Sequence, residues 1–108
     1  MTLDEYQNLA MRTMAPDTSH EKHLAVMGLG LTGEAGEVAE LLKKHLGHGH
    51  ELDNDKLEKE LGDVMWYVAG LARVRGLTLE RIAEKNVLKL MKRYPEGFSD
   101  VASKNRVE

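Results

Sequence analysis

The sequence predicts an all-α protein, a bundle of four or five helices. Three observations support this class. Apolar residues recur with the helical period over most of the chain, capping residues precede these stretches, and no stretch of any length alternates as a strand does. The length of 108 residues suits a single domain over residues 1–108. Because a domain of this size buries only a modest core, association of copies would help to stabilise it.

Two capping boxes open the first two helices. Thr2 and Glu5 begin a helix that should reach about residue 14. Pro16 makes its continuation unfavourable, because the residue before a proline avoids helical backbone angles. Thr18 and Glu21 begin a second helix, which should reach about residue 46.

Four glycines interrupt this second helix: Gly28, Gly30, Gly33 and Gly36. Each is expected to cost about 1 kcal/mol of helix stability relative to alanine. Such a dense cluster indicates either close packing against another backbone or a break of the helix between Gly28 and Gly33.

The second half of the chain begins with a loop at residues 47–50, whose two histidines, His48 and His50, are interpreted as solvated. Asp53 or Asn54 caps a third helix, which should span about residues 54–75. Gly76 is well placed to end it in the left-handed conformation.

Thr78 caps a fourth helix, which should end at Tyr94 and Pro95. The polar tail, about residues 99–108, is expected to be flexible.

Composition narrows the function classes. Apolar residues make up 42% of the chain and charged residues 31%, as in globular proteins. The N-terminus lacks a signal-peptide pattern and no apolar run could span a membrane, so a cytoplasmic protein without a membrane partner is expected. The absence of cysteine excludes thiolate metal sites and cysteine nucleophiles. The net charge of −3 argues against a nucleic-acid polymer as partner.

Four carboxylates stand out on the second and third helices. On helical wheels, Glu34 and Glu60 fall inside the apolar stripes of their helices, and Glu37 and Asp63 fall at the edges. Both segments read acid-x-Gly-acid-Val, which indicates two helices that face each other about a pseudo-twofold axis. The four carboxylates should then converge between them.

Converging carboxylates would repel one another and lose hydration, unless a cation compensates them. Because all the ligands are oxygens, a hard cation is expected, Mg²⁺ or its substitute Mn²⁺. The alternative is that these are ordinary Glu pairs in surface salt bridges, which the duplication and the apolar setting disfavour. A ferritin-like di-iron site is disfavoured because its Glu-x-x-His motif does not occur.

The fourth helix carries candidate phosphate binders. Asn86, Lys89 and Arg93 line one side of it, and an amide with two cations suits a phosphate chain. The alternative is that the cations extend from the edge of the core and favour the helix C-terminus. Tyr67 either binds phosphate or sugar, or is a core tyrosine. Trp66 points away from the carboxylates, as a residue of a subunit interface or a second core would.

At this point the chain resembles the all-α nucleoside triphosphate pyrophosphohydrolases, specifically the MazG-like proteins. The resemblance rests on E-x-x-E, 22 intervening residues and E-x-x-D, within GLTGEAGEVAEL, ELGDVMWYVAGLA and KNVLKLMKRYPEGF. It implies a magnesium enzyme that cleaves nucleoside triphosphates to the monophosphate and pyrophosphate. Glu34, Glu37, Glu60 and Asp63 match the family's metal ligands, and Asn86, Lys89 and Arg93 match its substrate-binding positions.

The resemblance also implies a homodimer or homotetramer with active-site helices packed across subunits. In the mechanism we expect, Glu37 or Glu34 accepts a proton from the attacking water. A rival interpretation is a non-catalytic, metal-stabilised helical dimer that binds nucleotides or a partner protein. A third keeps the enzyme but changes the substrate to a diphosphate or a modified nucleotide.

Overall fold

A computed structural model describes residues 1–16 and 18–106 of the chain. The described residues form five α-helices and one 3₁₀ turn, and they contain no strand, which confirms the all-α prediction. The elements are α1 (Leu3–Ala10), the 3₁₀ turn (Met11–Thr13), α2 (His20–His48), α3 (Asn54–Val74), α4 (Leu79–Arg93) and α5 (Asp100–Lys104).

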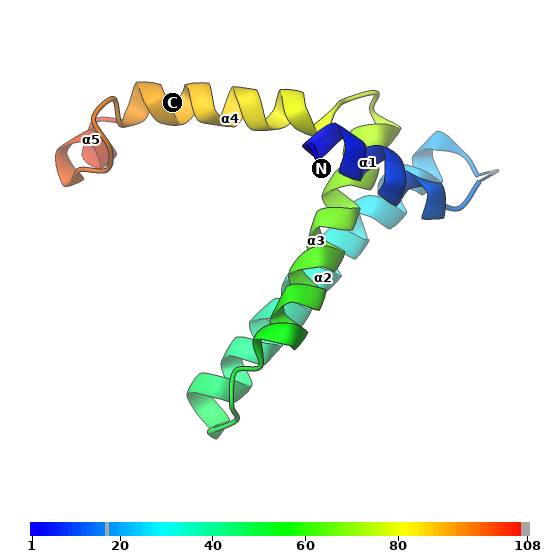
Figure 1. The fold of residues 1–108 in the computed structure, drawn as a ribbon, viewed down its shortest axis with the longest axis horizontal. Helices are drawn as coiled ribbons and strands as arrows, with labels where there is room; N and C mark the ends of the chain where they lie inside the picture. The colour runs from blue at the N-terminus through cyan, green and yellow to red at the C-terminus, as the bar shows by residue number, and fades with distance from the viewer. Residues whose placement is uncertain (17, 107–108) are drawn as a thin grey trace.

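The longest helices, α2 and α3, lie side by side as an antiparallel hairpin (Figure 1). The short helix α1 lies across the end of the hairpin where α3 ends and α4 begins, a junction that we call the elbow. From the elbow, α4 leaves the hairpin at a wide angle, and we call this helix the arm. Helix α5 lies beyond the far end of α4. The five helices therefore do not close into a single bundle within one chain, whose principal extents are 49 × 40 × 28 Å.

The helix ends agree with the predicted caps at three of four sites. Thr2, Asp53 and Thr78 accept hydrogen bonds from backbone N–H groups in the first turns of α1, α3 and α4. The predicted cap of α2 was wrong by one residue: the N-cap is Ser19 rather than Thr18, and the Ser19 hydroxyl accepts from the Lys22 N–H at 3.1 Å. Two adjacent hydroxyl residues compete for this position, and local sequence does not separate them.

The glycines of α2 do not break it, because the helix is continuous from His20 to His48. Gly30 faces the ring of Tyr67 on α3, and a Cβ atom there would overlap that ring. Gly70 on α3 likewise faces the thioether of Met27. The predicted break is therefore wrong, and close packing occurs at Gly30 against a side chain rather than against another backbone.

A small core lies at the elbow rather than along the hairpin. Its buried members are Met11, Ala69, Ala72 and Leu79, against which Tyr6, Ala10, Met14, Trp66 and Val68 pack. The Trp66 indole N–H donates to the Ala10 carbonyl at 3.2 Å and to the Thr13 hydroxyl at 2.7 Å. Trp66 thus belongs to a second core, one of the two roles that the sequence left open for it.

The tail contains the short helix α5, capped by Ser99. Its last two residues, 107 and 108, lie outside the described part of the chain, and the flexibility of the tail stays a prediction. Across the described residues, no helix combines the length and the apolar character that crossing a membrane requires.

Candidate metal and phosphate site

Three carboxylates meet in the middle of the hairpin. Glu34 comes from α2, and Glu60 and Asp63 come from successive turns of α3. Each of the three offers an oxygen, and these oxygens all lie within 4.8 Å of one another. Glu34 and Glu60 are half-buried and Asp63 is exposed, so the group opens to solvent on one side. A solute can therefore reach the carboxylates.

Like charge accumulates at Glu34. Its pKa is raised above the ordinary carboxyl value, first by burial and then by a side-chain hydrogen bond with Glu60. The negative charges of Asp63, Glu60 and Glu37 raise this pKa further. All these causes disfavour the ionised form, and a cation placed among the three carboxylates would oppose them.

The donor set fits a magnesium ion. It consists only of carboxylate oxygens, which hard divalent cations prefer. Mg²⁺ keeps several waters and takes few protein ligands, so three carboxylates on an open side of a hairpin suit it. The remaining coordination positions would be available to water or phosphate.

Glu37 lies outside this group. It is exposed on α2, one turn beyond Glu34, and its charge is the smallest of the causes that raise the Glu34 pKa. Four carboxylates were predicted to converge, and the structure brings three of them together. The Glu37 carboxylate is near enough to influence the group electrostatically without being one of its three members.

Two tyrosines lie near the hairpin surface that bears the carboxylates. Tyr67 packs over Gly30 and makes an edge-to-face contact with Trp66, with ring centroids 5.0 Å apart. Tyr6 on α1 was missed by the sequence analysis. Its pKa is raised by burial and then by the negative charge of Asp63, which indicates that α1 brings its phenol towards the carboxylates. No local signal could have found Tyr6, because its position depends on how α1 docks.

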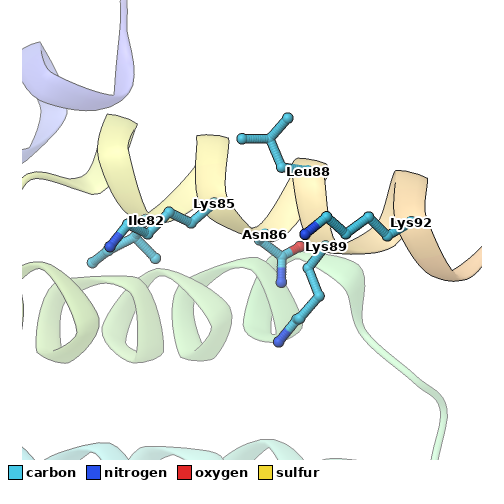
Figure 2. A pocket seen from close by; sticks show the side chains of 6 residues that line it. All are labelled: Ile82, Lys85, Asn86, Leu88, Lys89 and Lys92. Atoms are coloured by element: carbon cyan, nitrogen blue, oxygen red, sulfur yellow. The ribbon is translucent and has the colours of Figure 1, made fainter. Parts of the chain in front are cut away.

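The predicted phosphate binders lie on α4. Figure 2 shows the side chains of Asn86 and Lys89 on the same side of this helix, with Leu88 on the opposite side. A cavity of about 480 Å³ lies along α4 and is lined by Ile82, Lys85, Asn86, Leu88, Lys89 and Lys92. Lys85 and Lys92 are cations that the sequence analysis did not select. The Arg93 Nε atom is buried, and within the described residues it has no hydrogen-bond partner.

Within one chain, α4 does not bring these cations to the carboxylates. The arm leaves the end of the hairpin and diverges from it (Figure 1), whereas the carboxylates lie near the middle of α2 and α3. Among the described residues, neither Lys89 nor Arg93 forms an ion pair. The structure thus assembles three of the predicted acids and leaves Lys89 and Arg93 apart from them. Asn86 lines a cavity of about 330 Å³ together with Val64 and Val68 of α3.

The chain is an all-helical domain that carries three carboxylates on a helical hairpin and several cations on a separate helix. These features are typical of proteins that bind a metal ion and a phosphate compound. Comparison with known families makes the assignment narrower. Residues 22–98 match the MazG nucleotide pyrophosphohydrolase domain, and the chain belongs to this family. The matched residues include all the carboxylates and arm residues considered above.

One relative is similar to the chain over nearly the whole length of both proteins. The chain is 38% identical to the "Gene 37 protein" of Mycobacterium phage L5 over an alignment of 114 positions, which covers 98% of this chain and 100% of the relative. No solved structure matches the chain significantly. The name of this relative states no activity, so the functional assignment rests on the family match.

Proposed function

We propose that the chain is a magnesium-dependent hydrolase of nucleoside triphosphates, acting on NTPs or dNTPs. Water would attack the α-phosphorus, the bond from that phosphorus to the α,β-bridging oxygen would break, and the monophosphate and pyrophosphate would leave. The observation that carries the proposal is the group formed by Glu34, Glu60 and Asp63 on a chain of the MazG nucleotide pyrophosphohydrolase family.

Glu34, Glu60 and Asp63 would hold the ion, and Mn²⁺ is expected to substitute for Mg²⁺. When bound, the ion would neutralise charge on the phosphates and lower the pKa of the attacking water. The hairpin would contribute fixed ligand positions, since Gly30 and Tyr67 hold α2 and α3 close together beside the carboxylates. This fixed register of the two helices would orient the triphosphate for attack.

Glu37 is the residue that we propose as the general base. It lies outside the group of three and is exposed, so its carboxylate is free to accept the proton of the attacking water. The Glu37→Gln variant should lose about 10²- to 10⁴-fold in kcat, because general base catalysis is worth roughly that factor. Its affinity for Mn²⁺ should stay close to that of the unmodified protein, as measured by calorimetry.

Glu40 provides the matched control for this test. It lies one turn further along α2 and forms ion pairs with Lys43 and Lys44, at 3.3 and 3.9 Å. The Glu40→Gln variant should keep both kcat and Mn²⁺ affinity. If Glu37→Gln lost Mn²⁺ affinity in proportion to its activity, Glu37 would be a ligand rather than the base.

Asn86, Lys89 and Arg93 would bind the triphosphate and stabilise the leaving pyrophosphate. The Tyr67 hydroxyl would form a hydrogen bond with a phosphate or sugar, and the Tyr67 ring packs against Gly30. Because α4 diverges from the hairpin of its own chain, we propose that the arm of one chain reaches the carboxylates of a second copy. The assembly would be a homodimer or homotetramer.

Exposed apolar residues support this assembly. On α4, Ile82, Val87, Leu88, Leu90 and Met91 are between 38% and 62% exposed. Leu29 and Leu46 on α2 are 74% and 81% exposed. Apolar side chains exposed along two long helices are typical of surfaces that another chain covers.

A nucleotide panel in H₂¹⁸O tests the proposed reaction. The protein is incubated with Mg²⁺ and a set of canonical and modified nucleotides, which includes NTPs, dNTPs and diphosphates. The products are then separated, and the ¹⁸O content of each is measured by mass spectrometry. Attack at the α-phosphorus predicts ¹⁸O in the monophosphate and none in the pyrophosphate. Label in pyrophosphate would contradict the assigned bond, and no product from any nucleotide would favour the non-catalytic helical dimer.

A further inference from the structure

The elbow between α3 and α4 contains a buried amide that joins three helices. Gln7 on α1 is 2% exposed, and within the described residues it is the one buried polar side chain. Its Nε2 donates to the Ala69 carbonyl on α3 at 3.2 Å and to the Leu77 carbonyl in the linker at 3.1 Å. Its Oε1 accepts from the Leu79 N–H, the first residue of α4, at 3.1 Å. Gln7 thus connects the two sides of the elbow.

The bond to the Leu79 N–H satisfies a backbone group that α4 itself leaves unpaired. The first N–H groups of an α-helix have no partner within it, so a buried helix start requires partners from elsewhere. At the start of α4, the Gln7 side-chain oxygen accepts from the Leu79 N–H, and the Asp4 carboxylate accepts from the Glu80 N–H at 3.1 Å. Two side chains of α1 therefore cap the start of α4.

A third contact from the same face of α1 joins it to the end of α3. Arg73 donates to the Asn8 side-chain oxygen at 2.7 Å. Positions 4, 7 and 8 are three and four residues apart, so they lie on one side of a helix. This side of α1 is therefore bonded to the end of α3 and to the start of α4 at once.

Besides these bonds, the buried side chain of Leu79 and the packing of α1 hold the first turn of α4. Beyond the elbow the arm diverges from the hairpin (Figure 1), and most of its large apolar residues are exposed within one chain. Lys89 lies ten residues beyond Leu79, which is about 15 Å along a helix. A swing of about 10° at the elbow would therefore move Lys89 by about 3 Å and Arg93 by somewhat more. Displacements of that size are large compared with the precision that catalysis requires.

We propose that Gln7 is a positioning residue, which sets the direction of α4 and thereby the place where Asn86, Lys89 and Arg93 meet the triphosphate. This inference rests on the proposed function. Gln7 itself would touch neither the substrate nor the carboxylates, because its amide is fully occupied at the elbow.

The first test replaces the amide by an apolar side chain of similar length. Gln7→Met should lower kcat/KM by about 10²-fold, because misplacement by about 1 Å has an effect of that order. Its Mn²⁺ affinity should be unchanged, because the carboxylates lie on the hairpin. Met11→Ala is the control: it removes a buried side chain of the same core without removing a bond of Gln7, and it should keep kcat/KM within about 3-fold at a temperature where both variants are folded.

The second test measures the arm directly and does not require activity. The chain has no cysteine, so cysteines introduced at His48, at the tip of the hairpin, and at Glu84, on α4, can be spin-labelled selectively. Labelled chains are diluted with unlabelled ones, so that the electron–electron distance reports a single chain. Gln7→Met should shift or broaden the distance distribution by about 3 Å or more, the displacement expected for a swing of about 10°. Met11→Ala should leave it unchanged.

Asp4→Ala provides a milder variant if Gln7→Met does not fold. It removes the cap on the Glu80 N–H from a partly exposed residue, and it should shift the distance distribution in the same direction by less. An unchanged distribution or an unchanged kcat/KM in the folded variant would overturn the proposal. If the unmodified protein cleaved no nucleotide, the proposed function would fail, and the distance measurement would still decide whether Gln7 orients the arm.

Discussion

The α2–α3 hairpin and the α4 arm differ in what each completes within one chain. The hairpin brings three carboxylates together, and it closes through glycine contacts at Gly30 and Gly70. The arm presents cations and an exposed apolar surface, and it is held mainly at its first turn. This difference is what we expect if, as we propose, the metal group is pre-formed within one chain and the residues proposed to bind phosphate act only when a second copy is present.

The largest effect is expected when two variants, one changed in the hairpin and one changed in the arm, are mixed and their activity is measured. The Glu60→Gln and Arg93→Ala variants should each be nearly inactive alone, because each lacks one half of every composite site. Mixed after dissociation, they should recover about a quarter of the activity, since about half of random dimers are mixed and each mixed dimer has one intact site. The measurement is pyrophosphate release before and after mixing. No recovery would show that carboxylates and cations act within one chain.

A smaller effect tests the closure of the hairpin. Gly30→Ala places a Cβ atom against the Tyr67 ring, so it should lower the free energy of unfolding by about 1–3 kcal/mol, as overpacking does. Gly33→Ala is the control on the same helix, because no atom lies within 4 Å of its Cβ position. That variant should instead gain about 0.5–1 kcal/mol from helix propensity. Urea unfolding of both variants gives the comparison, and equal losses would contradict the close approach at Gly30.

The smallest effect concerns the elbow. The pKa of Glu80 is raised by a side-chain hydrogen bond with Asp4, then by the charges of Asp4 and Glu84. A raised carboxyl pKa in the folded state means that the stability from this pair is present below the ordinary carboxyl pKa. It is lost as the pH rises through the raised value. Glu80→Gln should therefore weaken the decrease in melting temperature between mildly acidic and neutral pH. An unchanged pH profile would show that Glu80 and Asp4 do not interact.

The sequence alone was sufficient where the controlling forces are local. Helical periodicity and caps predicted α1 to α4, with an error of one residue at the cap of α2, where Ser19 replaces Thr18. The short helix α5, which Ser99 caps, was not predicted. The acid-x-Gly-acid spacing predicted the facing carboxylates, because residues three apart share a face of a helix. The exclusion of Glu37 depends on how the two helices meet, which the spacing does not specify.

The remaining features depend on contacts distant in sequence. Gln7 bonds to Ala69, Leu77 and Leu79, more than 60 residues away, and nothing near Gln7 in the sequence distinguishes it from a surface amide. Tyr6 approaches the carboxylates for the same reason, through the docking of α1. The divergence of α4 was not predicted either, because its apolar stripe is equally consistent with packing inside its own chain.

The most direct test of the account compares two glutamates on α3 under one set of conditions. Glu60 belongs to the carboxylate group, whereas Glu58 is exposed and outside it. Mn²⁺ affinity and Mg²⁺-dependent pyrophosphate release are measured for Glu60→Gln and Glu58→Gln. We predict that Glu60→Gln stays folded and loses at least about 10²-fold in both quantities, since even residues that only support a metal ligand are worth about 10- to 100-fold. Glu58→Gln should match the unmodified protein. Normal turnover by a folded Glu60→Gln protein would contradict the account.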